Sequence, residues 1–599
     1  MREKISGNTT ATIYSFDFRT RQDDETLESG QASIWLASVI GDDVTLDFYT
    51  IDDFLDGIFE LSKKENICLY CFDLAFHWSF IFYGLLRKGF QFTKRFTKNS
   101  SNCFSAFGTE HASIVYSASI KKNKSSGSIY FKDIKQVYAG YKSLEEMSSS
   151  FKSNRIFYPD DLEKKHPEGE KPTIEEHANC ESRSGFVFDV LKRQEDDAEF
   201  FRAFTLASHS IKAAIRYGFR KLRNPFAAYR SGRMFPRIEE EDQIEALRQS
   251  IKGGLTGPTM PAIDAGYNIE KPMFVIDRTQ SYPSEMNSSL LPRGCGEHFN
   301  GIELGPFIYL YHVKIESFDF VKFHSLPVLM QNHIHFMPEG SEPILLWLWD
   351  FEYWQAFKCY SGLKAQVIEG YRYGKGKCPF WEYVAMNQEK RKALEAKGDH
   401  IGAAHIKALN VSIYGKLIQR NSKERIMQKL DEETGVLDTE TEERKKEKEA
   451  TYIYLPAGSA IPALSRFHII EMAERFGFEN IMYIETDSLI ILDNEKTRAV
   501  LDSMELSKDL NHWHLETFIK EAYFPMAKRY KYLKEDGTAV VKGAGVDVAA
   551  FAASDYASIK ITGNKITMRM KKKAHGGTLL VKITKNLKEI EKGKDNGGI

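Results

Sequence analysis

Two acidic residues, far apart in the sequence, each follow a short apolar run. Asp277 ends the run Phe274-Val-Ile276, and Asp487 follows Met482-Tyr-Ile484, with Glu485 between. A carboxylate at the end of a buried strand is costly unless it is paired with a cation or binds a metal. Two such carboxylates in one sheet could hold two Mg²⁺ ions about 3.5–4 Å apart, the arrangement that serves phosphoryl transfer. The simpler interpretation is two unrelated aspartates in turns, so the surrounding residues must decide.

Each carboxylate lies in a short segment whose polar and aromatic residues stand at characteristic intervals. In chain order, three such segments are Asp277-Arg-Thr-Gln-Ser-Tyr282-Pro283-Ser284, Lys407-Ala-Leu-Asn-Val-Ser412-Ile-Tyr414-Gly415-Lys416 and Tyr483-Ile-Glu485-Thr-Asp487-Ser488. They resemble motifs A (D-x-x-S-L-Y-P), B (K-x3-N-S-x-Y-G) and C (Y-x-D-T-D-S) of family B DNA polymerases, in that family's order. Two flanking segments resemble its K-x-Y and Y-x-G-G motifs, namely Lys528-Arg529-Tyr530 and Ile251-Lys-Gly253-Gly254.

Further features resemble the protein-primed branch of this family, which small tailed phages use. The stretches between motifs A and B and after motif B match that branch's two insertions, and residues 568–577 are similar to the end of its thumb. The resemblance covers nearly the whole chain. It implies an α/β multidomain fold, with an RNase H-like exonuclease-type domain and a right-hand polymerase of palm, fingers and thumb that carries two insertions in the palm.

The resemblance also implies domain limits. We expect an exonuclease-like domain, a palm in two parts, fingers, a thumb and the two insertions. In chain order these are 1–205 (exonuclease-like, expected to be inactive), 206–287 (palm, first part), 288–383 (insertion of the terminal-protein-region type), 384–418 (fingers), 419–455 (second, charged insertion), 456–550 (palm, second part) and 551–599 (thumb).

The matching positions imply roles at the polymerase site. Asp277 and Asp487 would bind two Mg²⁺ ions, with Mn²⁺ as an alternative, and Glu485 would be the third catalytic acid. Tyr282 would lie under the sugar of the dNTP and exclude a 2′-OH. Lys407 would contact the triphosphate, although a lysine on a solvated helix face is the simpler interpretation of that residue.

Other positions would contact the nucleotide or the DNA. Tyr414 would pack at the nascent base pair, and a second phosphate ligand would come from Lys390, Arg391 or Lys392. The residues that we expect to contact the primer–template are Lys528, Tyr530, Gly253, Gly254 and Lys542. The implied partners are therefore a DNA primer–template and dNTPs, and the resemblance leaves open a priming terminal protein.

The sequence departs from the family at its exonuclease motifs. The first motif, D-x-E, reads Asp17-Phe-Arg19, and the second, N-x3-D, reads Asp73-Leu-Ala-Phe-His77. Near residues 180–190, the closest candidate for a third carboxylate is Asp189 in Phe186-Val-Phe-Asp189. A site that keeps one or two of the family's four acids, with a cation in place of another, is not expected to bind two Mg²⁺ ions. We therefore expect a degenerate module that keeps the fold without the activity.

The polymerase motifs depart less. Glu485 stands where motif C has its first Asp, Val411 replaces the Asn of motif B, and Gln280 replaces a Ser of motif A. Glutamate keeps the charge of aspartate and adds one methylene, so we expect activity to survive, with an altered preference among metals.

The charge distribution and the apolar runs predict the partners and the location of the protein. The 599 residues carry a net charge of −1, but residues 212–237 contain eight Lys or Arg and no acid, and residues 560–599 contain eleven against three acids. Such one-signed tracts suit a phosphate backbone. No apolar run approaches the ~18 residues of a membrane span, and the first residues do not resemble a signal peptide. We expect a cytoplasmic location in a bacterial host cell, no membrane partner, and reduced cysteines.

The sequence thus predicts a DNA-directed DNA polymerase of a phage, prophage or mobile element. It would add dNMP from dNTP to a 3′-OH or a protein-primer hydroxyl, without proofreading. Two alternatives stay open: a primer-independent or untemplated nucleotidyl transferase, for example in phage defence, and a non-catalytic nucleic-acid-binding scaffold.

Overall fold

A computed structural model gives the fold of most of the chain. It describes residues 1–6, 9–20, 34–93, 96–97, 99–108, 115–138, 143–151, 155, 171–193, 206–229, 235–419, 424–430, 437–443, 453–543, 564–572 and 578–586. Two basic residues of the tract at 212–237, Arg230 and Arg233, lie outside this part, as do most residues of the thumb segment 551–599. None of the helices within the described ranges is long and apolar enough to cross a bilayer.

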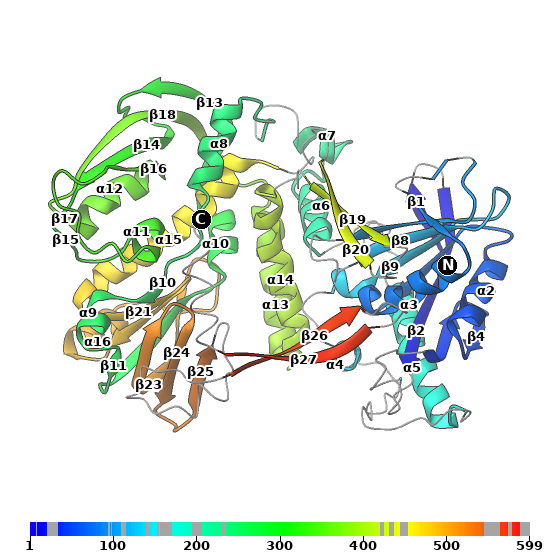
Figure 1. Cartoon of the computed structure of the whole chain (residues 1–599). Helices are drawn as coiled ribbons and strands as arrows, with labels where there is room; N and C mark the ends of the chain where they lie inside the picture. Colours follow the sequence, from blue (N-terminus) through cyan, green and yellow to red (C-terminus); the bar gives the residue numbers. More distant parts are fainter. Residues whose placement is uncertain are drawn as a thin grey trace.

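The N-terminal part is a mixed sheet with helices on both faces, drawn in blue in Figure 1. Its strand order is β4-β3-β2-β5-β9-β8-β7-β6, with β1 paired to β2, and β5 runs parallel to both β2 and β9. The strands are β1 (Arg2–Ser6), β2 (Thr9–Thr20), β3 (Ile34–Ile40), β4 (Thr45–Phe48), β5 (Ile67–Cys71), β6 (Gln91–Phe92), β7 (Cys103–Gly108), β8 (Val115–Lys121) and β9 (Ile129–Asp133).

Successive side chains along these strands point to opposite faces of the sheet, and each face is part of a separate hydrophobic core. On one face α2 (Ile51–Leu61) and α3 (Leu74–Arg87) cover a cluster that includes Phe16, and on the other α5 (Ile174–Arg193) covers a cluster that includes Ile13. The apolar runs Ala11–Phe16 and Ile67–Cys71 thus lie in β2 and β5, at the centre of the sheet. The helix α4 (Leu144–Ser150) lies beside this domain.

The palm is an antiparallel sheet of order β10-β21-β22-β12-β23-β24-β25, with β11 on β23. Its central strand β12 (Met273–Arg278) is the apolar run that ends in Asp277, and four of its six residues in succession are buried. The other strands are β10 (Thr256–Pro258), β11 (Asn268–Ile269), β21 (Ile481–Glu485), β22 (Ser488–Leu492), β23 (Trp513–Met526), β24 (Arg529–Lys534) and β25 (Ala539–Gly543). Three short helices flank the sheet: α9 (Met260–Asp264), α10 (Ser281–Ser288) and α16 (Glu495–Asp502).

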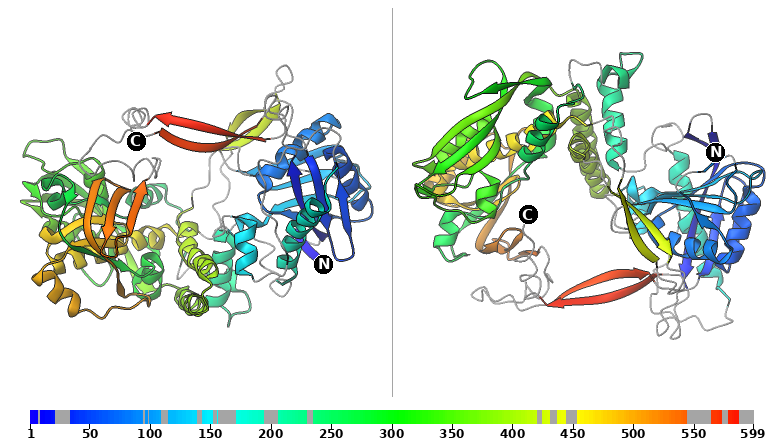
Figure 2. Two further views of the ribbon diagram at one scale, coloured as in Figure 1. Left: turned by 90° about the horizontal axis from the view of Figure 1, so that it is seen from below. Right: turned by 45° about the horizontal axis from the view of Figure 1, so that its top comes forward.

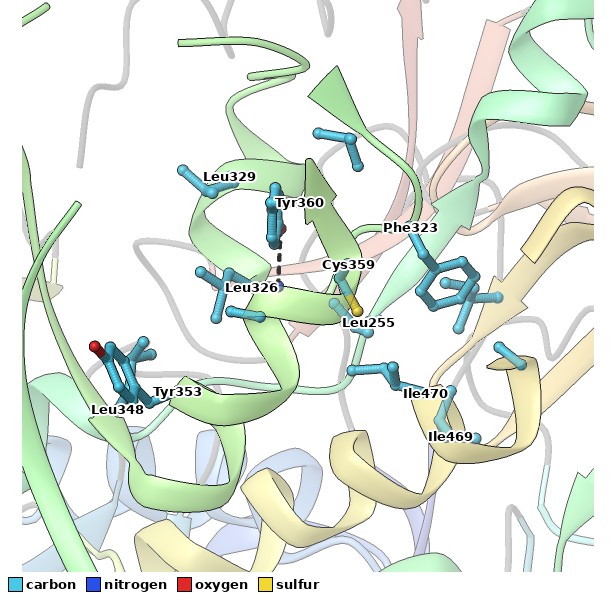
Figure 3. Close-up of a cluster of buried hydrophobic side chains, with 14 of the residues drawn as sticks. Leu255, Phe323, Leu326, Leu329, Leu348, Tyr353, Cys359, Tyr360, Ile469 and Ile470 are labelled. Atoms are coloured by element: carbon cyan, nitrogen blue, oxygen red, sulfur yellow. Dashed lines mark hydrogen bonds between the residues drawn. The ribbon is translucent and has the colours of Figure 1, made fainter. Parts of the chain in front are cut away.

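Between β12 and the fingers lies a smaller sheet of order β13-β18-β14-β16. It lies at the upper left of Figure 1 and shares a large hydrophobic core with the palm. Figure 3 shows part of that core, where Leu255, Cys359 and Tyr360 meet Ile469 and Ile470. Its elements are β13 (Leu290–Asn300), β14 (Ile308–Ser317), β15 (Phe320–Val321), α11 (Pro327–Gln331), β16 (Ile344–Trp349), α12 (Asp350–Cys359), β17 (Tyr360–Ser361) and β18 (Lys364–Lys377).

Helices connect the palm with the N-terminal domain. The segment predicted as the fingers, 384–418, is a helical pair, α13 (Trp381–Ala396) and α14 (His400–Leu417). The helix α14 packs on α6 (Leu206–Gly218) and contacts α4, so the pair lies between the two halves of the molecule in Figure 1. The long helix α15 (Leu455–Phe476) packs behind the palm, and α7 (Pro225–Tyr229) and α8 (Glu241–Ser250) precede β10.

Two hairpins complete the chain. The segment 419–455, predicted as the second, charged insertion, contains the paired strands β19 (Glu424–Leu430) and β20 (Leu437–Glu443). The strands β26 (Asn564–Lys572) and β27 (Thr578–Asn586) form the other hairpin. In both views of Figure 2 this red hairpin spans from the palm toward the N-terminal domain, where β27 reaches α3.

Candidate active site

Asp277 lies at the end of β12, and Asp487 lies in the turn between β21 and β22, directly before the strand that pairs with β12. In the sheet register Asp277 is opposite Ser488 of β22 on one side and His514 of β23 on the other. The backbone N–H of Arg278 donates to the carbonyl of Asp487 at 2.8 Å, which fixes the two segments to each other. The structure thus brings together the two carboxylates that the sequence singled out.

The electrostatic surroundings of this pair favour an added cation. Burial and the negative charge of Asp487 raise the pKa of Asp277 to about 8, although the nearby charge of Lys407 acts the other way. Burial also raises the pKa of Asp487, and there Lys407 and Lys528 oppose the effect. The two carboxylates are therefore not neutralised by the protein alone.

The donor set fits magnesium or manganese. Carboxylate oxygens are ligands that both ions prefer, and Mg²⁺ usually keeps several waters and takes substrate phosphate oxygens as well. Among the described residues, no group of three or more His, Cys, Asp or Glu side chains is placed to hold a metal by itself. Asp277 and Asp487 would consequently share any ion with water and a triphosphate.

A tight turn connects Glu485 to Asp487. Thr486 lies in this turn with a φ of 60°, a left-handed conformation that is rare for a β-branched residue. Gly254 packs directly against it, since a Cβ at that position would lie 2.7 Å from Thr486 Cγ2. The Thr486 N–H also donates to the carbonyl of Leu255 at 2.8 Å. The Gly-Gly segment therefore braces the turn between Glu485 and Asp487.

Glu485 faces a lysine. Its Oε1 forms an ion pair with Lys528 Nζ, and the same Nζ donates to Thr486 Oγ1 at 3.1 Å. Lys528 itself has a φ of 60°, and its backbone N–H donates to Tyr483 Oη at 2.8 Å. The extra methylene of glutamate thus connects motif C to the K-x-Y segment, and the charge of Glu485 is paired without a metal.

Two tyrosines meet in front of the palm sheet. The rings of Tyr282 on α10 and Tyr414 on α14 are 4.8 Å apart between centroids, at 59° to each other. Burial raises the pKa of Tyr414 to about 12. The helix α10 is held in place by a fully buried ion pair between Glu285 and Arg278, the residue that follows Asp277. The position of Tyr282 is therefore coupled to the end of β12.

The fingers place cations near these carboxylates. Lys407 is exposed on α14, and its positive charge opposes the rise in pKa that burial causes at both Asp277 and Asp487. Arg391 on α13 also acts on Asp277, while Lys392 forms ion pairs with Asp509 and Glu389. Lys390 is exposed at the same helix. Of the three candidates that the sequence could not separate, Arg391 is the one whose charge acts on Asp277.

Motif B shows a local rearrangement. Val411, which stands where the family has Asn, is 37% exposed on α14. The preceding Asn410 is fully buried instead, where it accepts from Asn387 Nδ2 at 2.9 Å and donates to the carbonyl of Val384 at 3.2 Å. An asparagine is thus retained nearby, but it joins the two fingers helices and leaves an apolar side chain toward solvent.

The expected DNA contacts lie beside motif C. The ring of Tyr530 on β24 packs 5.0 Å from that of Tyr483, and burial raises its pKa. Lys542 on β25 is opposite Tyr530 in the sheet register and is exposed. Lys528, Tyr530 and Lys542 therefore form one edge of the palm, next to the Gly-Gly segment.

The N-terminal domain contains a buried carboxylate at Asp17 on β2. His77 Nε2 lies 3.1 Å from Asp17 Oδ1, and Arg183 Nε donates to Asp17 Oδ2 at 2.8 Å. Burial acts to raise the pKa of Asp17, but Arg183, His77 and Arg19 together outweigh it and lower the pKa to about 2. Protein cations therefore already neutralise this carboxylate.

The other acids of the degenerate motifs are also paired. Asp73 Oδ2 accepts from Lys135 Nζ at 2.7 Å, and Asp189 forms a bidentate pair with Arg155 at 2.6 and 3.2 Å. Sequence reasoning did not identify Arg183, which lies on α5 six residues before Asp189 and faces Asp17. The signal was a cation inside the segment searched for an acid, close to the buried run Phe186–Phe188.

Comparison with known proteins supports the fold and the family. The sequence model of DNA polymerase type B, organellar and viral, matches residues 187–500, slightly more than half of the chain. Phi29 DNA polymerase complexed with primer-template DNA and incoming nucleotide substrates superimposes with a TM-score of 0.79 at 20% identity, covering 96% of this chain and 100% of that one. Its orthorhombic crystal form gives 0.74 at 19% identity with the same coverage. At such identities the likeness shows the fold, and no curated protein sequence matches significantly.

Proposed function

Because this chain belongs to the organellar and viral type B DNA polymerases, we propose that it is a template-directed polymerase that adds dNMP from dNTP to a 3′-OH or to a protein-primer hydroxyl. The observation that carries this proposal is the pair Asp277 and Asp487. These half-buried carboxylates lie side by side at the end of β12 and in the turn between β21 and β22, lack sufficient countercharge, and face Lys407 of the fingers. A scaffold protein would have no use for this costly arrangement.

Each residue of the site has a role in the proposed reaction. Asp277 and Asp487 would hold two Mg²⁺ ions, with Mn²⁺ as an alternative. When bound, the ions stabilise the charge on the attacking and leaving oxygens of an in-line displacement. Lys407, with Arg391 beside it, would bind and orient the triphosphate, as cations do in other phosphoryl transfer sites.

The aromatic pair would select the nucleotide. Tyr282 would lie under the deoxyribose, where its ring leaves no room for a 2′-OH, and Tyr414 would pack on the nascent base pair. Lys528 and Tyr530 would contact the primer terminus from the edge of the palm. The Phi29 polymerase structure with the same fold contains primer-template DNA and incoming nucleotides, which supports these partners.

Two further properties belong to the proposal. The N-terminal domain would lack proofreading, since its central carboxylate is already paired with His77 and Arg183. The enzyme would come from a phage, a prophage or a mobile element and would accept a priming terminal protein, on the resemblance of its insertions to those of the protein-primed branch.

Primer extension with Asp487→Asn tests the site. We expect incorporation of dNTPs to fall at least about 10³-fold, the scale on which loss of one member of a catalytic set acts. Asp493→Asn is the matched control, because Asp493 follows β22 and pairs with Arg498 outside the site. Incorporation that survives in Asp487→Asn would refute the assigned site. A homopolymer made by the wild type without template would favour the untemplated transferase, and no product at all would favour the scaffold.

A further inference from the structure

Arg466 is an arginine that is almost completely buried. It lies on α15 behind the palm sheet and is 2% exposed, and Glu352 on α12 is 4% exposed. Arg466 Nε donates to Glu352 Oε1 at 3.1 Å, and Nη2 donates to the same oxygen. Glu352 Oε2 accepts from the backbone N–H of Trp349 at 3.2 Å. Both carboxylate oxygens are therefore used, and the ion pair is fixed at the start of α12.

The remaining donor of Arg466 reaches the Gly-Gly segment. Its Nη1 donates to the carbonyls of Lys252 and Gly253, each at 2.8 Å. A planar guanidinium can make all of these bonds at once, whereas a lysine ammonium cannot reproduce the fork. The segment that precedes β10 is thus held from behind by a side chain whose own position Glu352 determines.

The same segment braces the catalytic turn. Leu255, which is 1% exposed, packs with Ile469 and Ile470 of α15 in the core shown in Figure 3. Its carbonyl accepts from the N–H of Thr486, and Gly254 lies against the Thr486 side chain. A left-handed conformation at a β-branched residue persists only where the surroundings impose it. The turn between Glu485 and Asp487 therefore depends on the position of residues 252–255.

We propose that Arg466, fixed by Glu352, is a positioning residue that maintains the metal-binding geometry of Asp487 through the Gly-Gly segment and Thr486. The contacts run without a gap from α12 of the 288–383 insertion to the end of β21. We call the ion pair of Arg466 and Glu352, with its hydrogen bonds to residues 252 and 253, the clasp. The charge of Arg466 also acts on Tyr282 and Tyr414, so the clasp lies behind the nucleotide site as well. This inference rests on the proposed polymerase function.

The test compares Arg466→Lys and Glu352→Gln with a control at the same helix interface. Gln355 is buried on α12, and its Nε2 donates to the carbonyl of Phe467 at 2.9 Å. This bond joins α12 to α15 and does not involve residues 252–255. Gln355→Leu therefore disturbs the α12–α15 contact and spares the clasp. Hydrogen–deuterium exchange of peptides that cover 483–490 reports the Thr486 amide without metal, DNA or turnover.

In Arg466→Lys we expect exchange at 483–490 to rise about tenfold. The half-saturating Mg²⁺ concentration for primer extension should rise, and kcat should fall, by 10- to 100-fold, the usual effect of losing a group that orients a metal ligand. The KM for dNTP and primer–template binding should change far less. Glu352→Gln should give the same pattern more weakly, and Gln355→Leu should stay within about twofold of the wild type in every readout.

The outcomes separate the two proposals. Unchanged exchange at 483–490 in both clasp variants, or an equal change in Gln355→Leu, would overturn the positioning role. If Arg466→Lys does not fold, Glu352→Gln decides, together with Gly254→Ala, which presses on Thr486 from the other side and should raise the Mg²⁺ requirement. A wild type that extends no primer refutes the polymerase, and the exchange data still decide the clasp.

Discussion

Asp17 and Asp277 each lie on a strand of one of the two large sheets, and their surroundings have opposite electrical character. Asp17 in the N-terminal domain forms ion-pair contacts with Arg183 and His77, which lower its pKa to about 2. Asp277 in the palm faces Asp487, and burial and this second negative charge raise its pKa to about 8. One carboxylate already has its cations, and the other still needs one. The partners of an acid, rather than the acid alone, decide whether a site can bind a metal.

The largest expected difference between the two regions is catalytic. A wild-type sample that extends matched primers should release no mononucleotide from a 3′-labelled mispaired primer in Mg²⁺, with at least about 10³-fold between the two rates, because Asp17 has no metal to hold. Asp17→Asn should leave extension within about twofold of the wild type. Robust release of the label by the wild type would remove the contrast between the regions.

The next difference concerns stability and has opposite signs. Asp17→Asn leaves Arg183 and His77 buried without their partner and should lower the free energy of unfolding by about 3–5 kcal/mol. Asp277→Asn removes a repulsive charge and should raise it by about 1–2 kcal/mol, as happens where function and stability conflict. Urea unfolding of the three proteins in EDTA measures both. Equal signs would show that the two sites do not differ as described.

The smallest effect is the pH dependence of these differences. The folded-state pKa of Asp17 is lowered, so its stabilisation is fully present above the unfolded pKa of about 3.9 and is lost as pH falls toward 2. The folded-state pKa of Asp277 is raised, so its ionisation destabilises the protein increasingly between about pH 4 and 8. The Asp17→Asn difference should therefore be flat from pH 8 to 5, while the Asp277→Asn difference should grow over that range in urea titrations. A flat Asp277→Asn difference would contradict this account.

The sequence predicted those parts of the site that depend on local patterns. β12 was visible as an apolar run ending in Asp277, and Lys407 was placed in the fingers through the motif that it shares with Tyr414. The pairing of Asp277 with Asp487 required the order of the motifs as well, because no local signal connects two strands that lie so far apart in the chain.

Other parts depend on contacts that a single sequence does not contain. The face that α5 turns toward β2 decides that Arg183, rather than Asp189, meets Asp17. Lys392 pairs with Glu389 and Asp509, whereas Arg391 pairs with Glu395 and its charge also acts on Asp277. The hairpin of β19 and β20 is a pairing of two strongly charged strands, whose composition predicts solvent exposure but not a ladder.

The topology of the palm determines when the active site can form. β12 has both of its neighbours, β22 and β23, in the part of the chain that follows the insertion and the fingers. Contacts between distant segments form slowly, because the long intervening loop must close first. During synthesis the N-terminal sheet has all its strands long before β12 acquires either neighbour, so its folding is not tied to that of the palm. Catalytic competence is consequently among the last properties that a nascent chain acquires, and an apolar strand stays unpaired until then.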